Sequence, residues 1–243
     1  RGANLKLKPS KCKFFKYDIE FLGHVVSALG VSTDPEKVRV VRDWPVPTCV
    51  GDVRSFVGLC SYYRRYVRDF AQVAAPLHRL TGKRVTFEWS DECQKAFDEL
   101  KARLTSAPIL AMPTDDGQYI LDTDASNFSI GAVLSQVQDA GQERVIAYAS
   151  RTLKGPELNY CATRKELLAV AFYIKHFRPY LLGPREFLVR TDHSALQWLR
   201  RMPDPVGQNA RWLESMEEYL PFTIQHRAGL KHGNADALSR RPC

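Results

Sequence analysis

The chain changes character at the proline-containing stretch 106–113, and this change limits the folds that it can adopt. Before that stretch, helical patterns with clear start and stop signals dominate. After it, three short runs of β-forming residues follow one another at 118–124, 130–136 and 144–149, with a turn signal at 139–141. Three adjacent strands followed by alternating helices and strands predict a mixed sheet with helices packed on it. The sequence therefore predicts a mostly helical part followed by an α/β part.

The remaining elements follow from capping residues and from apolar spacing. In the first part we expect strands only within 12–32, as a hairpin of KCKFF and EFLGHVV, and then helices that begin at Asp34-Pro35, span 50–66 and 70–80, and follow Ser90. In the second part the sequence predicts a helix over 162–177, a strand at 186–190, a short helix from Ser194, a helix near 211–219, a strand at 222–226 and a last helix from Asn234. With the three runs above, these strands give a five-stranded mixed sheet.

Composition excludes several classes of protein. With 44% hydrophobic, 26% charged and 11% aromatic residues, the chain can build a folded core. No apolar run approaches the roughly 20 residues that a membrane span requires, so we expect no membrane partner. The six cysteines form no CxxC pair, which disfavours a disulfide framework or a zinc site. The expectation is an intracellular, reduced protein.

The net charge of +8 lies almost entirely in the first part, because residues 1–110 account for +7. A basic part of this kind is typical of a protein that binds nucleic acid, but it is equally compatible with a solubilising surface. Aromatic and basic residues interleave over 54–70, where the spacing predicts Phe56 and Tyr63 in the core. The candidates for contact with a nucleic-acid backbone are Lys11, Lys13, Arg54, Arg64, Arg65 and Arg68.

Four acids of the second part stand where expected strands end or helices begin, and each has a structural explanation on its own. Asp124 ends a strand, and Thr163-x-x-Glu166 fits a capping box. Asp192 precedes a helix, and Asp236 lies in a first helical turn, where an acid is stabilised.

Together, these four acids indicate a metal site. Strand ends and helix starts face the same rim of an α/β sheet, and carboxylates that converge there repel one another unless cations lie between them. Hard oxygen ligands select Mg²⁺ or Mn²⁺. Two such ions, about 3.5–4 Å apart, catalyse phosphodiester hydrolysis, one by activating water and one by stabilising the leaving oxygen. A two-ion nuclease centre is therefore the prediction for the second part.

Four separated motifs carry a family resemblance: TDAS (123–126), KELLAV (165–170), VRTDHSAL (189–196) and QHRAGLKHGNADALSR (225–240). In order and spacing they resemble the ribonuclease H domain of gypsy-type LTR retrotransposon Pol polyproteins. The resemblance implies that the metal-binding carboxylates are Asp124, Glu166, Asp192 and Asp236. It also implies that His226 assists proton transfer or product release.

Three further polar residues stay outside this catalytic set. Asp122 shares a strand face with Asp124, but the acid directly before Ala-Ser is the one that matches the motif. His193 is expected at the rim of the site, and His232 in a loop.

The first part resembles the end of the palm and the thumb of the same family's reverse transcriptase, and EFLGHVVS matches the hairpin that grips the primer strand. The implied organisation is a palm end at 1–32, thumb-like helices at 33–82, a connection at 83–112 and a ribonuclease H-like domain at 113–243. The polymerase's paired-aspartate motif is absent and would lie upstream of residue 1. The chain is therefore expected to be a fragment of a larger polyprotein, or a truncated or domesticated remnant, that cannot make DNA alone.

The resulting hypothesis is an endonuclease that hydrolyses the RNA strand of RNA/DNA hybrids with two Mg²⁺ or Mn²⁺ ions. The implied partners are the hybrid, the upstream palm and fingers, and a second copy of the chain. The implied location is the cytoplasm, within virus-like particles, or the nucleus. Two alternatives stay open: a nucleic-acid-binding remnant that no longer cuts and need not bind Mg²⁺, and a DNA-cutting transposase on the same fold, whose cores usually need only three acids.

Overall fold

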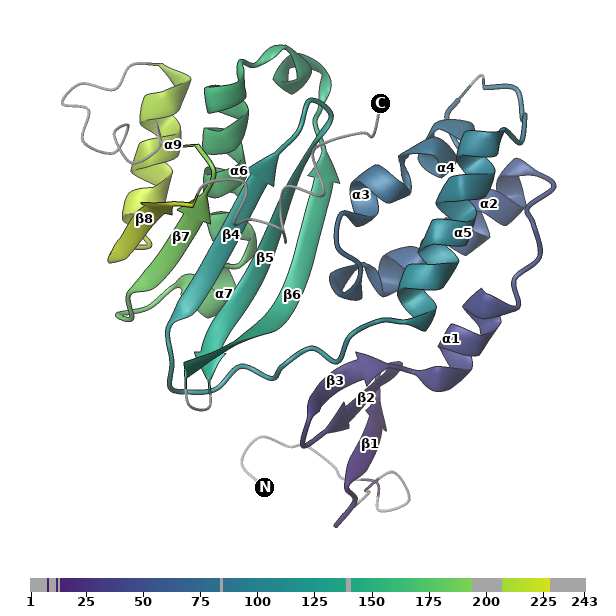
Figure 1. Cartoon of the computed structure of the whole chain (residues 1–243), viewed down its shortest axis with the longest axis horizontal. Helices are drawn as coiled ribbons and strands as arrows, with labels where there is room; N and C mark the ends of the chain where they lie inside the picture. Colours follow the sequence, from purple (N-terminus) through teal and green to yellow (C-terminus); the bar gives the residue numbers. More distant parts are fainter. Residues whose placement is uncertain are drawn as a thin grey trace.

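The computed structural model describes residues 8, 12, 14–83, 85–138, 141–193 and 207–227 (Figure 1). The first part holds β1 (Asp18–Phe21), β2 (His24–Ser27), β3 (Gly30–Thr33), α1 (Pro35–Arg42), α2 (Val50–Tyr62), a 3₁₀ turn at Arg64–Tyr66, α3 (Phe70–Val73), α4 (Ala75–Leu80) and α5 (Asp91–Thr105). The second part holds β4 (Tyr119–Ala125), β5 (Ser129–Gln138), β6 (Gln142–Thr152), a 3₁₀ turn at Gly155–Asn159, α6 (Ala162–His176), α7 (Arg178–Leu181), β7 (Phe187–Thr191), α9 (Gln208–Glu217) and β8 (Phe222–His226).

A five-stranded sheet forms the frame of the second part. Its strand order is β6-β5-β4-β7-β8. The β4–β5 and β5–β6 pairs are antiparallel, whereas β7 lies parallel to both β4 and β8. This arrangement confirms the predicted mixed sheet, with β8 at the predicted residues. The helices predicted from Ser194 and Asn234 lie outside the described residues.

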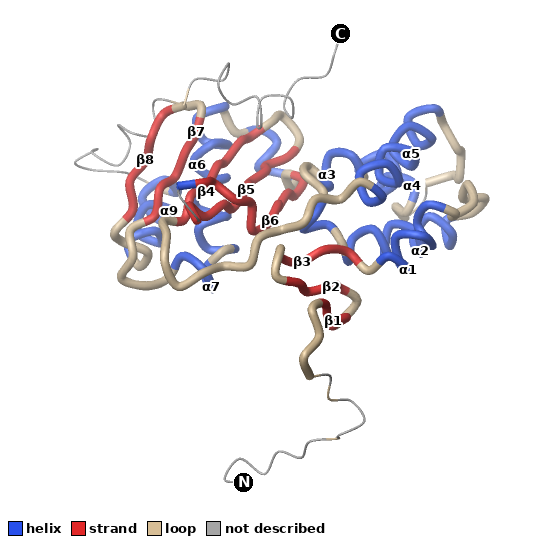
Figure 2. Tube along the Cα trace, turned by 60° about the horizontal axis from the view of Figure 1, so that its bottom comes forward, coloured by secondary structure: helices blue, strands red, loops and turns tan. Residues whose placement is uncertain are grey.

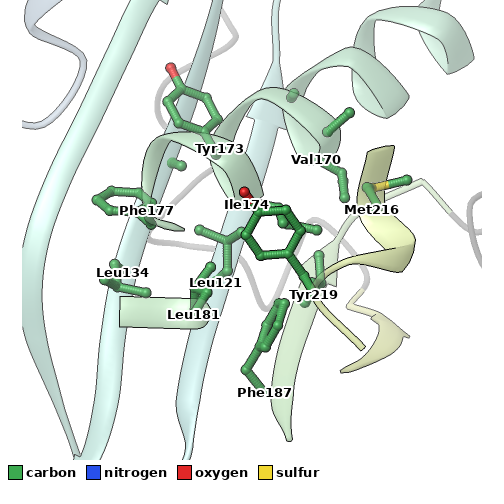
Figure 3. Close-up of a cluster of buried hydrophobic side chains, with 14 of the residues drawn as sticks. Leu121, Leu134, Val170, Tyr173, Ile174, Phe177, Leu181, Phe187, Met216 and Tyr219 are labelled. Carbon is green, nitrogen blue, oxygen red and sulfur yellow. The ribbon is translucent and has the colours of Figure 1, made fainter. Parts of the chain in front are cut away.

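The main core of the second part lies between this sheet and α6. Leu121 of β4, Leu134 of β5 and Phe187 of β7 are buried in one cluster with Val170 and Ile174 of α6 (Figure 3). Alternate residues of each strand point to this face, which is the period-2 pattern of a sheet covered by a helix. The packing fixes where α6 begins relative to the ends of β4 and β7.

In the first part, a small antiparallel sheet of order β1-β2-β3 precedes a group of short helices. The helix α1 begins as predicted, since the Asp34 side chain accepts a hydrogen bond from the Glu36 N–H at 2.9 Å. Phe56 and Tyr63 are only 0% and 1% exposed, which confirms their prediction as core residues. The linker after α5 passes β3, where Val31 and Leu110 form an isolated bridge (Figure 2).

Three predictions about elements of the first part were wrong in detail. The described residues of KCKFF form no strand, and the predicted hairpin is instead made by β1 and β2, with β3 added. The helix predicted over 50–66 ends at Tyr62 and is followed by a 3₁₀ turn. The helix predicted over 70–80 is divided at Ala74, because Pro76 has no N–H to continue the ladder. None of the described helices combines the length and apolar character that a bilayer crossing requires.

The two parts are joined by a contact between residues 64–71 and strand β6, which we call the junction (Figure 1). The Arg64 guanidinium donates a hydrogen bond to the Ser150 carbonyl. The Ala71 N–H donates to the Ser150 hydroxyl at 2.9 Å. Arg65 donates to the Ile146 carbonyl at 3.5 Å. Arginines that the sequence offered as nucleic-acid contacts therefore bind the backbone of the sheet.

One row of the sheet runs from the junction towards the end of β4. Ser150 pairs with Gly131, and Gly131 pairs with Asp124, so these residues lie side by side across β6, β5 and β4. Asp69 covers the row, because a methyl group added at Gly131 would lie 3.2 Å from its Oδ1. Burial raises the pKa of Asp69 to about 6. The first part is thus packed directly on the strand row that carries Asp124.

Candidate metal centre

Three carboxylates meet at one edge of the five-stranded sheet. Asp124 is the penultimate residue of β4, Asp192 follows the last residue of β7, and Glu166 lies near the start of α6. One oxygen from each of the three carboxylates lies within 4.8 Å of the others. The carboxyl ends of the parallel neighbours β4 and β7 meet at the same edge, and this is why residues distant in sequence converge. Asp236, the fourth predicted acid, lies outside the described residues.

Glu166 is the buried member of this cluster, at 5% exposure. Its Oε1 accepts a hydrogen bond from the Ala125 N–H at 3.0 Å. Its Oε2 is buried and has no hydrogen-bond partner among the described residues. Burial, and then the charges of Asp124 and Asp192, raise the pKa of Glu166 to about 9. A buried carboxylate with an unsatisfied oxygen beside two other acids fits a bound divalent cation, which would supply the missing positive charge.

The capping-box explanation of Glu166 is wrong. The N-cap residue of α6 is Cys161, with no side-chain cap, and the Glu166 carboxylate turns towards β4 instead. The Thr163 hydroxyl lies 3.2 Å from Nε2 of His193. The residue types of a capping box are present, but their side chains contact the cluster and the neighbouring strand end.

Two histidines flank Asp192. Nε2 of His226 lies 2.9 Å from the Asp192 carbonyl oxygen, so the structure places His226 beside the cluster, at the end of β8. His193 directly follows Asp192 in the chain, and its backbone N–H donates to the Thr191 hydroxyl at 3.2 Å. His232 lies outside the described residues.

Asp122, which the motif excludes, has a different role from Asp124. Arg190 of β7 donates to Asp122 through its Nε at 2.7 Å, and the same guanidinium donates to Glu143 at 3.0 Å. The side chains of Arg190 and Asp122 are only 10% and 13% exposed. The sequence patterns did not predict this network. A signal that could have indicated it is the charged Arg190 directly after the apolar run 187–189 of a predicted strand.

The predicted nucleic-acid contacts differ in their surroundings. Arg54 is exposed and donates to the Thr81 carbonyl at 3.2 Å. Arg64 and Arg65 bind β6 as described above, although Arg64 stays exposed. In Arg68, Nε and Nη2 are buried with no hydrogen-bond partner among the described residues. Lys11 and Lys13 lie outside the described residues.

Without metal, the chain is expected to lose stability as the pH rises from about 6 to 9. The pKa of Glu166 is raised from 4.5 to about 9, so the folded chain holds a proton that the unfolded chain has lost, and stability falls as the pH rises between these values. Asp69 adds to this slope only below its own pKa of about 6. Thermal melts in EDTA across pH 6–9 measure the effect, and Mg²⁺ should raise the melting temperature more at pH 8.5 than at pH 6. A flat profile in EDTA would contradict it.

Known proteins with similar sequences were found for both parts of the chain. The family model described as "RNase H-like domain found in reverse transcriptase" matches residues 89–189. The chain is 42% identical over 240 residues to the retrovirus-related Pol polyprotein from transposon 412 of Drosophila melanogaster, covering 99% of this chain and 19% of that protein. It is 36% identical over 251 residues to the Pol polyprotein from transposon gypsy of the same organism, covering 98% and 24%. The chain thus spans a fifth to a quarter of the length of these relatives.

Solved structures agree on the fold. The foamy viral protease-reverse transcriptase in complex with RNA/DNA hybrid has a TM-score of 0.73 and 20% identity, covering 93% of this chain and 31% of that one. The dRH form of that protein in complex with double-stranded DNA also has a TM-score of 0.73, with 21% identity, covering 87% and 38%. The predicted fold class is confirmed: a ribonuclease H-like five-stranded mixed sheet with flanking helices, preceded by a mostly helical part.

Proposed function

The chain belongs to the gypsy-type retrotransposon Pol polyproteins, and from this premise we propose that its second part is a ribonuclease H. It would hydrolyse the RNA strand of RNA/DNA hybrids as a metal-dependent endonuclease. The observation that carries the proposal is the convergence of Asp124, Glu166 and Asp192 within 4.8 Å, with one buried Glu166 oxygen unsatisfied. Oxygen ligands of this kind favour Mg²⁺, with Mn²⁺ as a substitute.

Each acid would have its own place around two ions. Asp124 and Asp192 would hold the ions jointly, Glu166 would bind on the leaving-group side, and Asp236 would complete the side of the attacking water. When bound, two such ions supply an activated water and stabilisation of the leaving oxygen. His226, beside the Asp192 carbonyl, would carry a proton or help to release the product.

The first part would hold the substrate. Its contact candidates are Lys11, Lys13, Arg54, Arg64, Arg65 and Arg68, and the exposure of Arg54 and Arg64 is consistent with this role. The net charge of +7 over 1–110 supports salt-sensitive binding to the phosphate backbone. We assign 1–32 to the end of a palm, 33–82 to a thumb, 83–112 to a connection and 113–243 to the nuclease. The partners would include the upstream palm and fingers and a second copy of the chain, in an intracellular setting.

The test is cleavage of a hybrid whose RNA strand carries a 5′ label. With Mg²⁺ the chain is expected to cut the RNA strand internally, to leave the DNA strand and duplex DNA intact, and to stop in EDTA. Asp124→Asn is the comparison variant. Equal cleavage by the parent chain and this variant would contradict the mechanism. Hybrid binding without cleavage by the parent would favour a silent remnant, and cleavage of duplex DNA would favour a transposase-like activity.

A further inference from the structure

The three elements that carry the candidate ligands are joined in pairs. The β4 and β7 strands are joined by their parallel ladder, which ends at the Asp122–Arg190 pair. The Ala125 N–H joins β4 to α6 through the Glu166 carboxylate. The third pair, α6 and the end of β7, is joined by the contact between the Thr163 hydroxyl and Nε2 of His193 at 3.2 Å.

That third contact lies next to both ligands that it joins. Thr163 precedes Glu166 by three residues, which is one turn of the same helix. His193 directly follows Asp192, beyond the end of β7, where the strand ladder no longer holds the chain. The contact therefore links the residue that follows Asp192 to the helical turn that carries Glu166.

Among the described residues, neither side chain has another hydrogen bond that would compete with this contact. Cys161 caps α6 without a side-chain bond, so the Thr163 hydroxyl is not used to cap its own helix. Nδ1 of His193 is buried and has no hydrogen-bond partner among the described residues, so the ring is held through Nε2. His193 is also absent from the ligand group found among the described residues, which contains three carboxylates.

We propose that the His193–Thr163 hydrogen bond is a positioning contact, which holds Asp192 and Glu166 at the separation that a divalent ion requires. The proposal rests on the proposed function for its metal site, but it concerns affinity for the ion rather than cleavage. Partners outside the ligand set that orient metal ligands typically change metal affinity by about 10–100-fold when they are removed. Neither residue would touch the ion.

The test measures binding of Mn²⁺ alone to the full chain, by the electron paramagnetic resonance signal of the free ion. Thr163→Val keeps the shape of the side chain and removes the hydroxyl, and it is expected to weaken Mn²⁺ binding about 10-fold. Thr163→Ser keeps the hydroxyl and is expected to stay within about 2-fold of the parent chain.

His193→Ala should weaken binding as Thr163→Val does, and His193→Gln, whose amide can replace Nε2, should recover most of the loss. Thr105→Val, on an exposed turn of α5, is the matched control and should change nothing.

A double variant separates positioning from general damage. If the two residues act through one hydrogen bond, Thr163→Val combined with His193→Ala binds Mn²⁺ no more weakly than the worse single variant. The melting temperature in EDTA should fall by no more than about 4 °C in either single variant. Additive losses, or parent-like binding in Thr163→Val, would overturn the proposal.

Two results for the parent chain distinguish failure of the proposed nuclease function from failure of this positioning contact. A parent chain that binds Mn²⁺ but cuts no hybrid would refute the nuclease, and the comparison of Mn²⁺ affinities would still decide the role of this contact. A parent chain that binds no Mn²⁺ would overturn both.

Discussion

Replacement of Glu166 by glutamine is expected to slow hybrid cleavage strongly while making the metal-free chain more stable. The Glu166 carboxyl group lies buried beside two acids, and its pKa of about 9 shows that its charged form is strongly destabilised in the folded chain. Glutamine keeps the size of the side chain and can still accept the Ala125 N–H, but it carries no charge to hold a cation. Cleavage should fall roughly 10²–10³-fold, as when one preorganised electrostatic group leaves a reaction centre.

The stability of this variant is measured in EDTA at pH 8. At pH 8 the folded chain must take up a proton on Glu166 that the unfolded chain does not hold, and glutamine removes this cost. The variant is therefore expected to be more stable than the parent chain by about 2 kcal/mol, or roughly 4–8 °C in melting temperature. Glu186→Gln, at an exposed position outside the cluster, is the matched control and should change neither cleavage nor stability. A Glu166→Gln variant that melts below the parent chain would show that the carboxylate stabilises the fold, and the electrostatic description of the site would fail.

Replacement of Arg190 by methionine is expected to destabilise the chain by about 3–5 kcal/mol. Its guanidinium binds Asp122 and Glu143, and the Asp122 side chain is only 13% exposed, so the substitution leaves an unpaired buried carboxylate. For a chain of this length, the melting temperature should fall by roughly 10 °C or more. Calorimetry or circular dichroism measures the change.

Two further variants identify the cause of that loss. Arg178→Met makes the same substitution in a pair with Glu218 whose side chains are 49% and 51% exposed, and it should cost less than about 1 kcal/mol. Arg190→Met combined with Asp122→Leu removes both buried charges and should recover most of the stability. If the double variant is as unstable as Arg190→Met alone, lost packing rather than an unpaired charge is responsible.

The outline of the site could be predicted from the sequence because topology alone brings its acids together. Asp124 and Asp192 stand at the ends of strands that turn out to be parallel neighbours, and α6 begins at the same edge. The strands themselves follow from local patterns, so β4, β7 and β8 begin within one residue of their predicted starts. The sequence can therefore predict which residues converge when their convergence depends only on the order and direction of the strands.

The roles of individual polar side chains could not be predicted in the same way. Thr163 and Glu166 have the spacing of a capping box, and only the fold shows that both turn towards neighbouring strands. The partners of Arg64 and Arg65 also cannot be predicted from the sequence, because a carbonyl of the chain and a phosphate of a nucleic acid both accept hydrogen bonds from guanidinium groups. Arg190 gave little signal, since its partners come from two other strands.

The junction limits how relatives of this chain could exchange their halves. A chimera joined within 106–113 would inherit residues 64–71 from one parent and strands β5 and β6 from the other. A methyl group at position 131 would lie 3.2 Å from Oδ1 of Asp69, so a larger residue there would require the Asp69 side chain to shift, and the Ala71 N–H donates to the hydroxyl of residue 150. These positions are therefore expected to be inherited as a set, so that the two halves can be exchanged between relatives only when both sides of the contact match.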